Sequence, residues 1–260
     1  MSTTIVAREV KKSFSIGRGS KRRVADVLRG VSLRVESGEM VGIVGPSGSG
    51  KSTLLYCLSG MDALTAGKVR YRGASITSLR ERDMAELRAQ RFGFVFQQAH
   101  LVSNLTLFEN VAVPGYLKEG RAPADTRAAA SALIERMGLT QDAHHLPSQA
   151  SGGQQQRCAV ARSVVNDPDI VFADEPTGAL NRANTLEVLA LLCELNRGGQ
   201  SICMVTHDVL CALRANRVLY LEDGAIKGEL ELPAFRPDGD AAYLKAREAQ
   251  VNAWLSSLAW

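Results

Sequence analysis

The stretch GPSGSGKS occupies residues 45–52 and fits the pattern G-x-x-x-x-G-K-S at every position. An apolar run, Met40–Val44, precedes it, and a helical stretch beginning at Ser52 follows it. Glycines at these positions let backbone N–H groups turn towards a triphosphate, and the start of a helix adds partial positive charge. We expect Lys51 to reach the β- and γ-phosphates and the Ser52 hydroxyl to ligate Mg²⁺. The sequence therefore predicts a phosphate-binding loop between a strand and a helix.

Two further motifs narrow the class of enzyme that this loop could serve. IVFADEP occupies residues 170–176, and Asp174 ends an apolar run, where its carboxylate could hold Mg²⁺ directly or through water. Glu175 follows as the group that would orient an attacking water. A phosphate-binding loop alone is compatible with kinases, GTPases and motors. The stretch SGGQQQR at residues 151–157, just before this acidic pair, favours one family of ATPases.

Length and composition are those of one large α/β domain. The chain has 260 residues, 45% of them hydrophobic, and 23 glycines, which suits a packed core. No apolar run approaches the roughly 20 residues that cross a bilayer, and the start, MSTTIVAREVKK, lacks the order of a secretory signal. We therefore expect a protein that is made and kept in the cytosol.

Cysteine and histidine usage gives no sign of a metal centre or a disulfide framework. The cysteines are odd in number, irregularly spaced and expected to be buried, reduced thiols: Cys57, Cys158, Cys193, Cys203 and Cys211. The adjacent His144 and His145 precede LPSQ in an expected loop and have no partner ligand nearby in the sequence. We expect these two histidines to be solvated.

The formal net charge of +4 is mild, but basic residues are concentrated near the N-terminus. They are Lys11, Lys12, Arg18, Lys21, Arg22 and Arg23. Such a cluster can meet nucleic acid or anionic lipid. Because no base-stacking aromatics are interleaved with it, we expect a solvated loop between two strands and no nucleic-acid partner.

Short apolar runs alternate with helical stretches, which predicts a mostly parallel sheet covered by helices. The expected strands are Met40–Val44, Val69–Arg72, Phe92–Phe96, Ile170–Ala173, Ser201–Val205, Arg217–Leu221 and Ile226–Leu232. The expected helices are Ser52–Ser59, Ala124–Met137 and Gly153–Val165. The last two strands are joined at Asp223-Gly224 like a hairpin. Residues 105–162 read as a helical insert.

A cluster of proline and glycine at residues 233–239 separates this core from a last segment, Ala241–Leu258. Its larger side chains recur every three or four residues, which predicts an amphipathic helix. They are Leu244, Arg247, Val251, Trp254, Leu255 and Leu258. We expect this helix to pack on its own domain, with contact to a partner subunit as the alternative.

These motifs together resemble the nucleotide-binding subunits of bacterial ABC systems, over nearly the whole chain. The resemblance is to the branch of macrolide-export, lipoprotein-release, cell-division and bacitracin-type peptide-resistance ATPases. It rests on GEMVGIVGPSGSGKSTLL, FGFVFQQAHLVSNLTLFENV, SGGQQQRCAVAR, FADEPTGAL and MVTHD, which begin at residues 38, 92, 151, 172 and 204. It implies an α/β fold: a P-loop NTPase (RecA-like) core with an antiparallel β subdomain and a helical subdomain that carries the signature motif.

The resemblance also implies a role for individual residues. Gln97 matches the glutamine of the Q-loop, which links the Mg²⁺ and water site to the helical subdomain, although Gln98 beside it is an alternative. His207 matches the switch histidine that contacts the γ-phosphate, with a helix-start role as the alternative. Phe14 would be the aromatic that stacks on adenine, or else an ordinary core residue.

The full expected site follows from the motifs and the resemblance together. Catalysis is assigned to Glu175, His207 and Gln97, and Mg²⁺ to Ser52, Gln97 and Asp174. ATP binding is assigned to Phe14, Gly45, Pro46, Ser47, Gly48, Ser49, Gly50, Lys51, Ser52, Thr53, Ser151, Gly152, Gly153 and Gln154. The cofactors implied are ATP and Mg²⁺. The expected ABC ATPase domain spans residues 1–232, with the helical subdomain at about 98–165, and the amphipathic tail spans 233–260.

Three positions depart from the family pattern. The usual leucine before SGGQ is Ala150, and the usual tyrosine for adenine is Phe14, which keeps a stacking face without a hydroxyl. The usual aspartate at the end of the D-loop is Asn181, which keeps an acceptor and loses the charge. This last change bears on how the two sites of a dimer communicate.

The resemblance implies a peripheral ATPase on the cytoplasmic side of the membrane, working with a separate transmembrane permease and a second copy of itself around two ATP–Mg²⁺. Transport or extrusion of a peptide, drug or lipid-linked molecule is the expected task. A mechanotransmission ATPase that drives an envelope or division process without transport is the alternative. A soluble ABC protein acting on ribosomes or DNA is disfavoured, because neither a second cassette nor a long coiled-coil insert is present.

The segment after Gln97 is expected to meet the membrane partner. LVSNLTLFENV, residues 101–111, joins the catalytic core to the helical insert, and by resemblance this region receives a short cytoplasmic helix of the permease. We expect Leu105 and Phe108 to take part in that groove.

Overall fold

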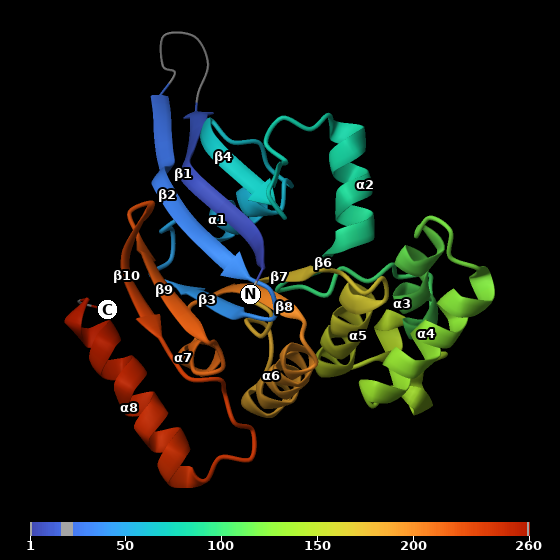
Figure 1. Ribbon diagram of the computed structural model, residues 1–260. Helices are drawn as coiled ribbons and strands as arrows, with labels where there is room; N and C mark the ends of the chain where they lie inside the picture. The colour runs from blue at the N-terminus through green and yellow to red at the C-terminus, as the bar shows by residue number, and fades with distance from the viewer. Residues whose placement is uncertain (1, 17–22, 259) are drawn as a thin grey trace.

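A six-stranded sheet runs through the centre of the molecule (Figure 1). The computed structural model describes residues 2–16, 23–258 and 260. The strand order is β10-β9-β3-β8-β7-β6, and all neighbours are parallel except the β9-β10 hairpin. The strands are β3 (Met40–Val44), β6 (Phe92–Val95), β7 (Ile170–Asp174), β8 (Ser201–Thr206), β9 (Arg217–Glu222) and β10 (Ala225–Glu231). The mostly parallel sheet predicted from the apolar runs is confirmed.

Both faces of this sheet are buried, which explains why its central strands read as unbroken apolar runs. In β3, Met40 and Val44 belong to one hydrophobic cluster, whereas Val41 and Ile43 belong to the other. Alternate residues of β7 and β8 divide in the same way, because successive side chains of a strand point to opposite faces. The sheet is therefore a middle layer between two cores.

An antiparallel sheet covers one of these faces together with helix α1. Its strand order is β2-β1-β4-β5, with β1 (Thr3–Ile16), β2 (Arg23–Glu36), β4 (Ala66–Tyr71) and β5 (Ala74–Ser75). The pairing of β1 with β2 has several register shifts. These irregularities break the strict alternation by which a strand is recognised in a sequence.

The expectation that the N-terminal basic cluster is a solvated loop is wrong for three of its members, which lie in strands. Lys11 and Lys12 lie within β1, and Lys12 is buried. Its ammonium donates to Asp62 Oδ1 at 2.6 Å and to the carbonyl oxygen of Ala63 at 2.7 Å. Arg23 begins β2. The other three members, Arg18, Lys21 and Arg22, lie outside the described residues.

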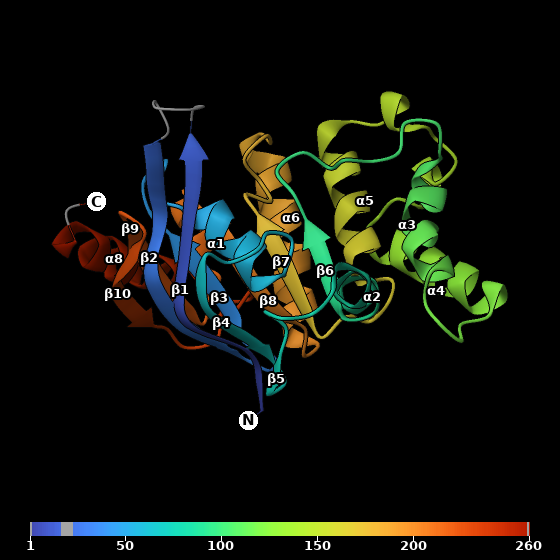
Figure 2. The ribbon, with the colours of Figure 1, turned by 90° about the horizontal axis from the view of Figure 1, so that it is seen from above.

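The opposite face is covered by helices, and a group of three stands apart at one end (Figures 1 and 2). In chain order the described helices are α1 (Lys51–Leu58), α2 (Glu81–Arg91), α3 (Leu107–Tyr116), α4 (Pro123–Arg136), α5 (Gly152–Val164), α6 (Arg182–Arg197), α7 (Val209–Ala212) and α8 (Ala241–Ser257). Of these, α1 and α2 contribute to the core on the side of the antiparallel sheet. The short 3-10 turns η2 (Thr140–Asp142) and η3 (Pro147–Gln149) lie between α4 and α5. The group of three is α3, α4 and α5, at the end of the sheet opposite β9, β10 and α8.

The last helix packs against its own chain, as its apolar spacing predicted. Val251 and Leu255 of α8 are buried in the core shared with the sheet, and Trp254 and Leu258 lie close to Gly228 of β10. Leu244, which the pattern placed on the apolar face, is 40% exposed. No helix in the described ranges is long and apolar enough to cross a membrane.

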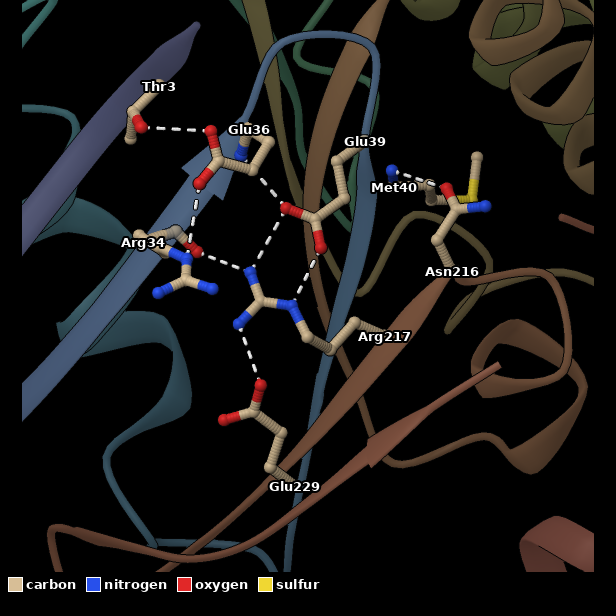
Figure 3. Close-up of polar contacts among 8 residues, drawn as sticks. All are labelled: Thr3, Arg34, Glu36, Glu39, Met40, Asn216, Arg217 and Glu229. Carbon is tan, nitrogen blue, oxygen red and sulfur yellow. Dashed lines mark hydrogen bonds and ion pairs between the residues drawn. The ribbon is translucent and has the colours of Figure 1, made fainter. Parts of the chain in front are cut away.

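A buried arginine fastens β9 to the turn that leads into β3 (Figure 3). Arg217 donates to both carboxylate oxygens of Glu39, at 2.6 and 3.0 Å, and to Glu229 at 3.0 Å. It also donates to the backbone carbonyl of Arg34. Burial alone would lower the pKa of this guanidinium, but the bonds and charges of Glu39 and Glu229 raise it above its usual value. These contacts join the two sheets at the beginning of β3 and β9, the end of these strands away from the phosphate loop.

Candidate nucleotide-binding site

Parallel strands bring the sequence motifs to one edge of the sheet. The phosphate loop follows Val44 of β3, Asp174 ends β7, and His207 follows Thr206 of β8. Gln97 lies two residues beyond the end of β6. In an open parallel sheet the carboxyl ends of the strands form the ligand-binding edge. The strand order therefore brings residues from distant parts of the sequence together at this edge.

Close approach of the chain requires two of the loop glycines. A Cβ at Gly45 would lie 2.0 Å from the carbonyl oxygen of Leu221 in β9. Gly50, which caps the start of α1, has a φ of 100°, and a Cβ there would lie 3.0 Å from the carbonyl oxygen of Val27. Any other residue would push the loop away from β9 and β2. The loop is thus wrapped tightly at the N-terminus of α1.

The side chain of Lys51 is folded back over this loop. Its ammonium donates to the carbonyl oxygens of Gly45 at 2.8 Å and Pro46 at 2.9 Å, and the residue is 7% exposed. Burial lowers the pKa of this amine, while the charges of Glu175 and Asp174 oppose that shift. A buried cation beside an anion-binding loop is suited to the terminal phosphates of a nucleotide.

Asp174 is held at both carboxylate oxygens from a single face of α1. The Ser52 hydroxyl donates to Oδ1 at 2.7 Å, and the Tyr56 phenol donates to Oδ2 at 2.6 Å. A hydroxyl and a carboxylate this close supply the oxygen ligands that Mg²⁺ prefers. The residues present therefore fit the metal expected from the sequence. Tyr56 was missed, although its position four residues after Ser52 places both on one helix face.

Glu175 and His207 contact each other at the mouth of the site. Glu175 Oε1 lies 2.9 Å from His207 Nδ1, and the backbone N–H of His207 donates to Glu175 Oε2 at 3.3 Å. Glu175 has a φ of 47°, in a region that costs a residue with a side chain about 1 kcal/mol or more. Its N–H donates to the carbonyl of Val205 at 2.9 Å. The backbone of the residue predicted to orient the attacking water is thus held in a strained conformation by the neighbouring strand.

These groups open onto one cleft of about 290 Å³. It is lined by Val27, Ser47, Gly48, Gly50, Lys51, Ser52, Thr53, Glu175 and His207. A Cβ at Gly48 would meet no atom within 4 Å, so the space beside this part of the loop is open. Val27 of β2 is a lining residue that the motifs did not indicate.

Several predicted residues lie outside this cleft lining: Gly45, Pro46, Ser49 and Asp174 lie in the loop or beside it, Gln97 lies beyond the end of β6, and Phe14 lies on β1. Gln97 is exposed, and its amide lies against Gly178, where a Cβ would come within 3.0 Å of Gln97 Nε2. Phe14 is 40% exposed on β1, so the alternative that it is a core residue is wrong. It pairs with Ala25, two residues before Val27 on β2.

The SGGQ residues lie at the start of α5 and also outside the cleft lining. Ser151 accepts a hydrogen bond from the N–H of Gln154, whose side chain accepts one from the N–H of Ser151. Gly153 faces Asn184 of α6, whose side chain a Cβ would meet at 2.6 Å. The described chain does not bring this motif together with its own phosphate loop.

Asn181 has a clear structural role in place of the usual aspartate. It is the N-cap of α6, and its side-chain oxygen accepts a hydrogen bond from the N–H of Asn184 at 3.0 Å. Asparagine and aspartate are about equally effective N-caps. The substitution therefore preserves the start of the helix and removes one charge.

The cysteines and the paired histidines form no second site in the described ranges. All five cysteines are free and buried, and burial raises the pKa of Cys158 and Cys203 to about 12. His145 Nδ1 lies 3.3 Å from Asp142 Oδ1, and no group of three metal-ligating side chains is found among the described residues.

Comparison with known proteins agrees with this geometry. Residues 28–178 match the family described as ABC transporter. The chain belongs to the ABC transporter family. It is an ATP-binding ABC ATPase with the P-loop NTPase fold that the sequence predicted.

Relatives and a solved structure give the same assignment. A macrolide export ATP-binding/permease protein MacB of Rhodopseudomonas palustris is 39% identical over 98% of this chain, which spans 39% of that relative. A lipoprotein-releasing system ATP-binding protein LolD of Aquifex aeolicus is 44% identical over 79% of this chain and 91% of its own. A dimeric ATP-binding cassette bound to ADP and Pi superposes with a TM-score of 0.81 at 36% identity, over 89% of this chain and 100% of its own.

Proposed function

We propose that this cassette powers bacterial export or extrusion of a drug, peptide or lipid-linked molecule through a separate transmembrane permease. It would lie at the cytoplasmic side of the membrane and act as a dimer with Mg²⁺ bound beside each ATP. The single observation that carries the catalytic part is the cleft where Lys51, Ser52, Glu175 and His207 meet. The similarity to macrolide-export and lipoprotein-releasing proteins supports the export part.

The roles of the site residues follow from their contacts. Lys51 would release its two backbone carbonyl partners and donate to phosphate oxygens instead. A charged phosphate oxygen accepts a stronger hydrogen bond from this buried cation than a neutral carbonyl does. Ser52 and Asp174 would hold Mg²⁺, which when bound neutralises charge on the β- and γ-phosphates. Glu175 would accept a hydrogen bond from the attacking water and orient it. His207, paired with Glu175, would contact the γ-phosphate. Gln97, which follows β6, would contact the attacking water and Mg²⁺.

A second hollow supports the docking of a membrane partner. A cavity of about 430 Å³ lies between β6 and the α3–α5 group, lined by Met61, Arg88, Ala89, Phe92, Gly93, Phe94, Phe96, His100, Pro114, Leu117, Arg162, Ser163 and Asn166. Leu117 is 67% exposed at its rim. An apolar groove of this kind accepts one face of a short helix. We assign it to a cytoplasmic helix of the permease.

Leu105 and Phe108, which the sequence suggested for this groove, do not line it. Phe108 packs against the hydrophobic core instead, and its N–H donates to the carbonyl of Ala143. Arg162 fixes the segment after the Q-loop by donating to the carbonyls of Ala99 and His100. The groove is therefore formed from β6 and the segment after it, together with the C-terminal parts of α2, α3 and α5.

The decisive experiment replaces the buried cation of the cleft. Lys51→Ala is expected to reduce ATP hydrolysis to background and to weaken ATP binding at least tenfold, because the charge that meets the β- and γ-phosphates is lost. Steady-state ATPase assays and nucleotide titration measure both effects. Lys245→Ala, an exposed lysine on α8, is the matched control. Near wild-type turnover in Lys51→Ala would overturn the proposed site.

A further inference from the structure

One buried amide joins the signature helix to two loops of the nucleotide site. Gln156 lies in the second turn of α5 and is 2% exposed. Its Nε2 donates to the carbonyl oxygen of Phe96 at 2.8 Å and to that of Pro176 at 2.7 Å. The two N–H bonds of a planar amide point in fixed directions. Gln156 therefore sets the positions of two carbonyls relative to each other and to α5.

The two carbonyls belong to neighbours of the proposed hydrolytic residues. Phe96 directly precedes Gln97, and Pro176 directly follows Glu175. A shift of α5 that kept these bonds would move the backbone next to Gln97 and the backbone next to Glu175. The preceding residue, Gln155, does not make the same link, because it donates to the carbonyls of Pro147 and Ala150 within the helical group.

We propose that Gln156 is a positioning residue, which transmits the engagement of the signature loop to the hydrolytic groups Glu175 and Gln97 of the same chain. The proposal rests on the proposed roles of these two residues. Ser151 and Gln154 cap the start of α5 reciprocally, so contact at the SGGQ loop moves the first turns of the helix as one piece. Gln156 lies within those turns and passes the displacement to both loops.

The primary test is Gln156→Met, which keeps the length of the side chain and removes both donors. We expect kcat for ATP to fall about tenfold to a hundredfold, since small displacements of catalytic groups have effects of this size. The KM for ATP should change less than about threefold, because Lys51 and the phosphate loop are unaltered. Gln156→Glu, which keeps the shape and places a carboxylate oxygen against the two carbonyls, should reduce kcat at least as much.

The matched control is Asn196→Leu. Asn196 also donates from one amide to two backbone carbonyls, those of Gly38 and Gln200, at 2.9 Å each, but far from the cleft. If Gln156 were only structural, both variants would lower the melting temperature alike and leave kcat alone. The proposal requires a loss of kcat in the folded Gln156 variants at unchanged KM, with Asn196→Leu retaining wild-type kcat.

A double substitution provides a second readout, independent of stability. In single-turnover assays, Gln156→Met added to Glu175→Gln should slow hydrolysis by less than the product of the two single effects, because one of the two groups being positioned is already disabled. Multiplicative losses would overturn the proposal, as would wild-type kcat in both Gln156 variants. Failure of the proposed function is distinct from these outcomes: Lys51→Ala would then hydrolyse ATP normally.

Discussion

The phenol of Tyr56 donates a 2.6 Å hydrogen bond to Oδ2 of Asp174, while the Ser52 hydroxyl donates to Oδ1 of the same carboxylate. Burial, and then the bond to Asp174, raise the pKa of Tyr56 to about 12, so the phenol is protonated and can donate at neutral pH. When Ser52 turns its oxygen to a metal, Tyr56 remains to orient the carboxylate. Outer partners of this kind contribute to metal affinity.

Tyr56→Phe removes this donor and keeps the ring that packs beside Asp174. We expect the Mg²⁺ concentration for half-maximal ATPase activity to rise about tenfold, in line with the loss of other outer partners of metal ligands. Activity measured against free Mg²⁺ at saturating ATP gives the value. Tyr116→Phe, on the exposed surface of α3, is the control and should match the wild type. An unchanged Mg²⁺ dependence of Tyr56→Phe would contradict the prediction.

If the permease docks in the apolar groove, a substitution at the groove rim should impair transport and leave ATP hydrolysis unchanged. Leu117→Glu places a charge at the groove rim and should leave the ATPase activity of the isolated chain within about twofold of wild type. In the reconstituted complex, binding of the permease should weaken about tenfold or more, because an apolar contact is replaced by a charge that must be desolvated.

The control for the groove is Leu244→Glu, an exposed leucine on α8, which should bind the permease normally. Crosslinks from position 117 to the permease would support the assignment. Crosslinks confined to the C-terminal helix, with normal binding by Leu117→Glu, would move the docking site to α8.

Much of the fold could be predicted because the central strands are buried on both faces. The short apolar run Ile170–Ala173 predicted a buried strand, observed as Ile170–Asp174, and α4, α5 and α8 agree with prediction to within two residues at each end. Helix α2 was missed because it is polar nearly all round, with Met84 alone buried. Helix α3, which contains Pro114, was also missed, although its Thr106–Glu109 capping box was visible in the sequence.

In the candidate site too, some residues could be predicted from a local sequence pattern and others were revealed only by tertiary contacts. Lys51, Asp174 and His207 could be found because each sits in a short local motif at the end of a strand. Tyr56 and Gln156 were missed, because their partners lie far away in the sequence: 118 residues for Tyr56, and 60 and 20 residues for Gln156. A tyrosine or glutamine on a helix has many solvated alternatives, and only the tertiary contacts distinguish them.

The cluster around Arg217 predicts a large effect on stability. Arg217→Met leaves the mostly buried carboxylate of Glu39 without its bidentate partner, and loss of one partner of a buried ion pair costs about 3 kcal/mol or more. Urea unfolding followed by circular dichroism measures the free energy of unfolding. Arg34→Met removes the exposed ion pair with Glu36 and should cost less than about 1 kcal/mol. Equal losses in the two variants would contradict this ranking.

The separation of Ser151 from the cleft predicts a shared site between two copies of the chain. SGGQ forms the exposed, capped start of a helix, a geometry that binds anions, yet it lies outside the cleft lining of its own phosphate loop. A two-fold dimer would place Ser151 of each copy opposite Lys51 of the other, with ATP between them.

Glu175→Gln keeps the size of the side chain and removes the charge that activates water, so ATP should bind and persist. We expect this variant to accumulate as an ATP-dependent dimer in light scattering after size exclusion, with hydrolysis reduced about a hundredfold or more.

Adding Ser151→Arg should abolish the dimer, because a bulky side chain fills the loop that meets the phosphate. Ser256→Arg, on exposed α8, is the control and should leave the dimer intact. A dimer that forms equally well with Ser151→Arg on both copies, or wild-type turnover in Glu175→Gln, would contradict the shared site. Both outcomes are read at high protein concentration, since isolated subunits that dimerise weakly would otherwise hide the difference between Ser151→Arg and its control.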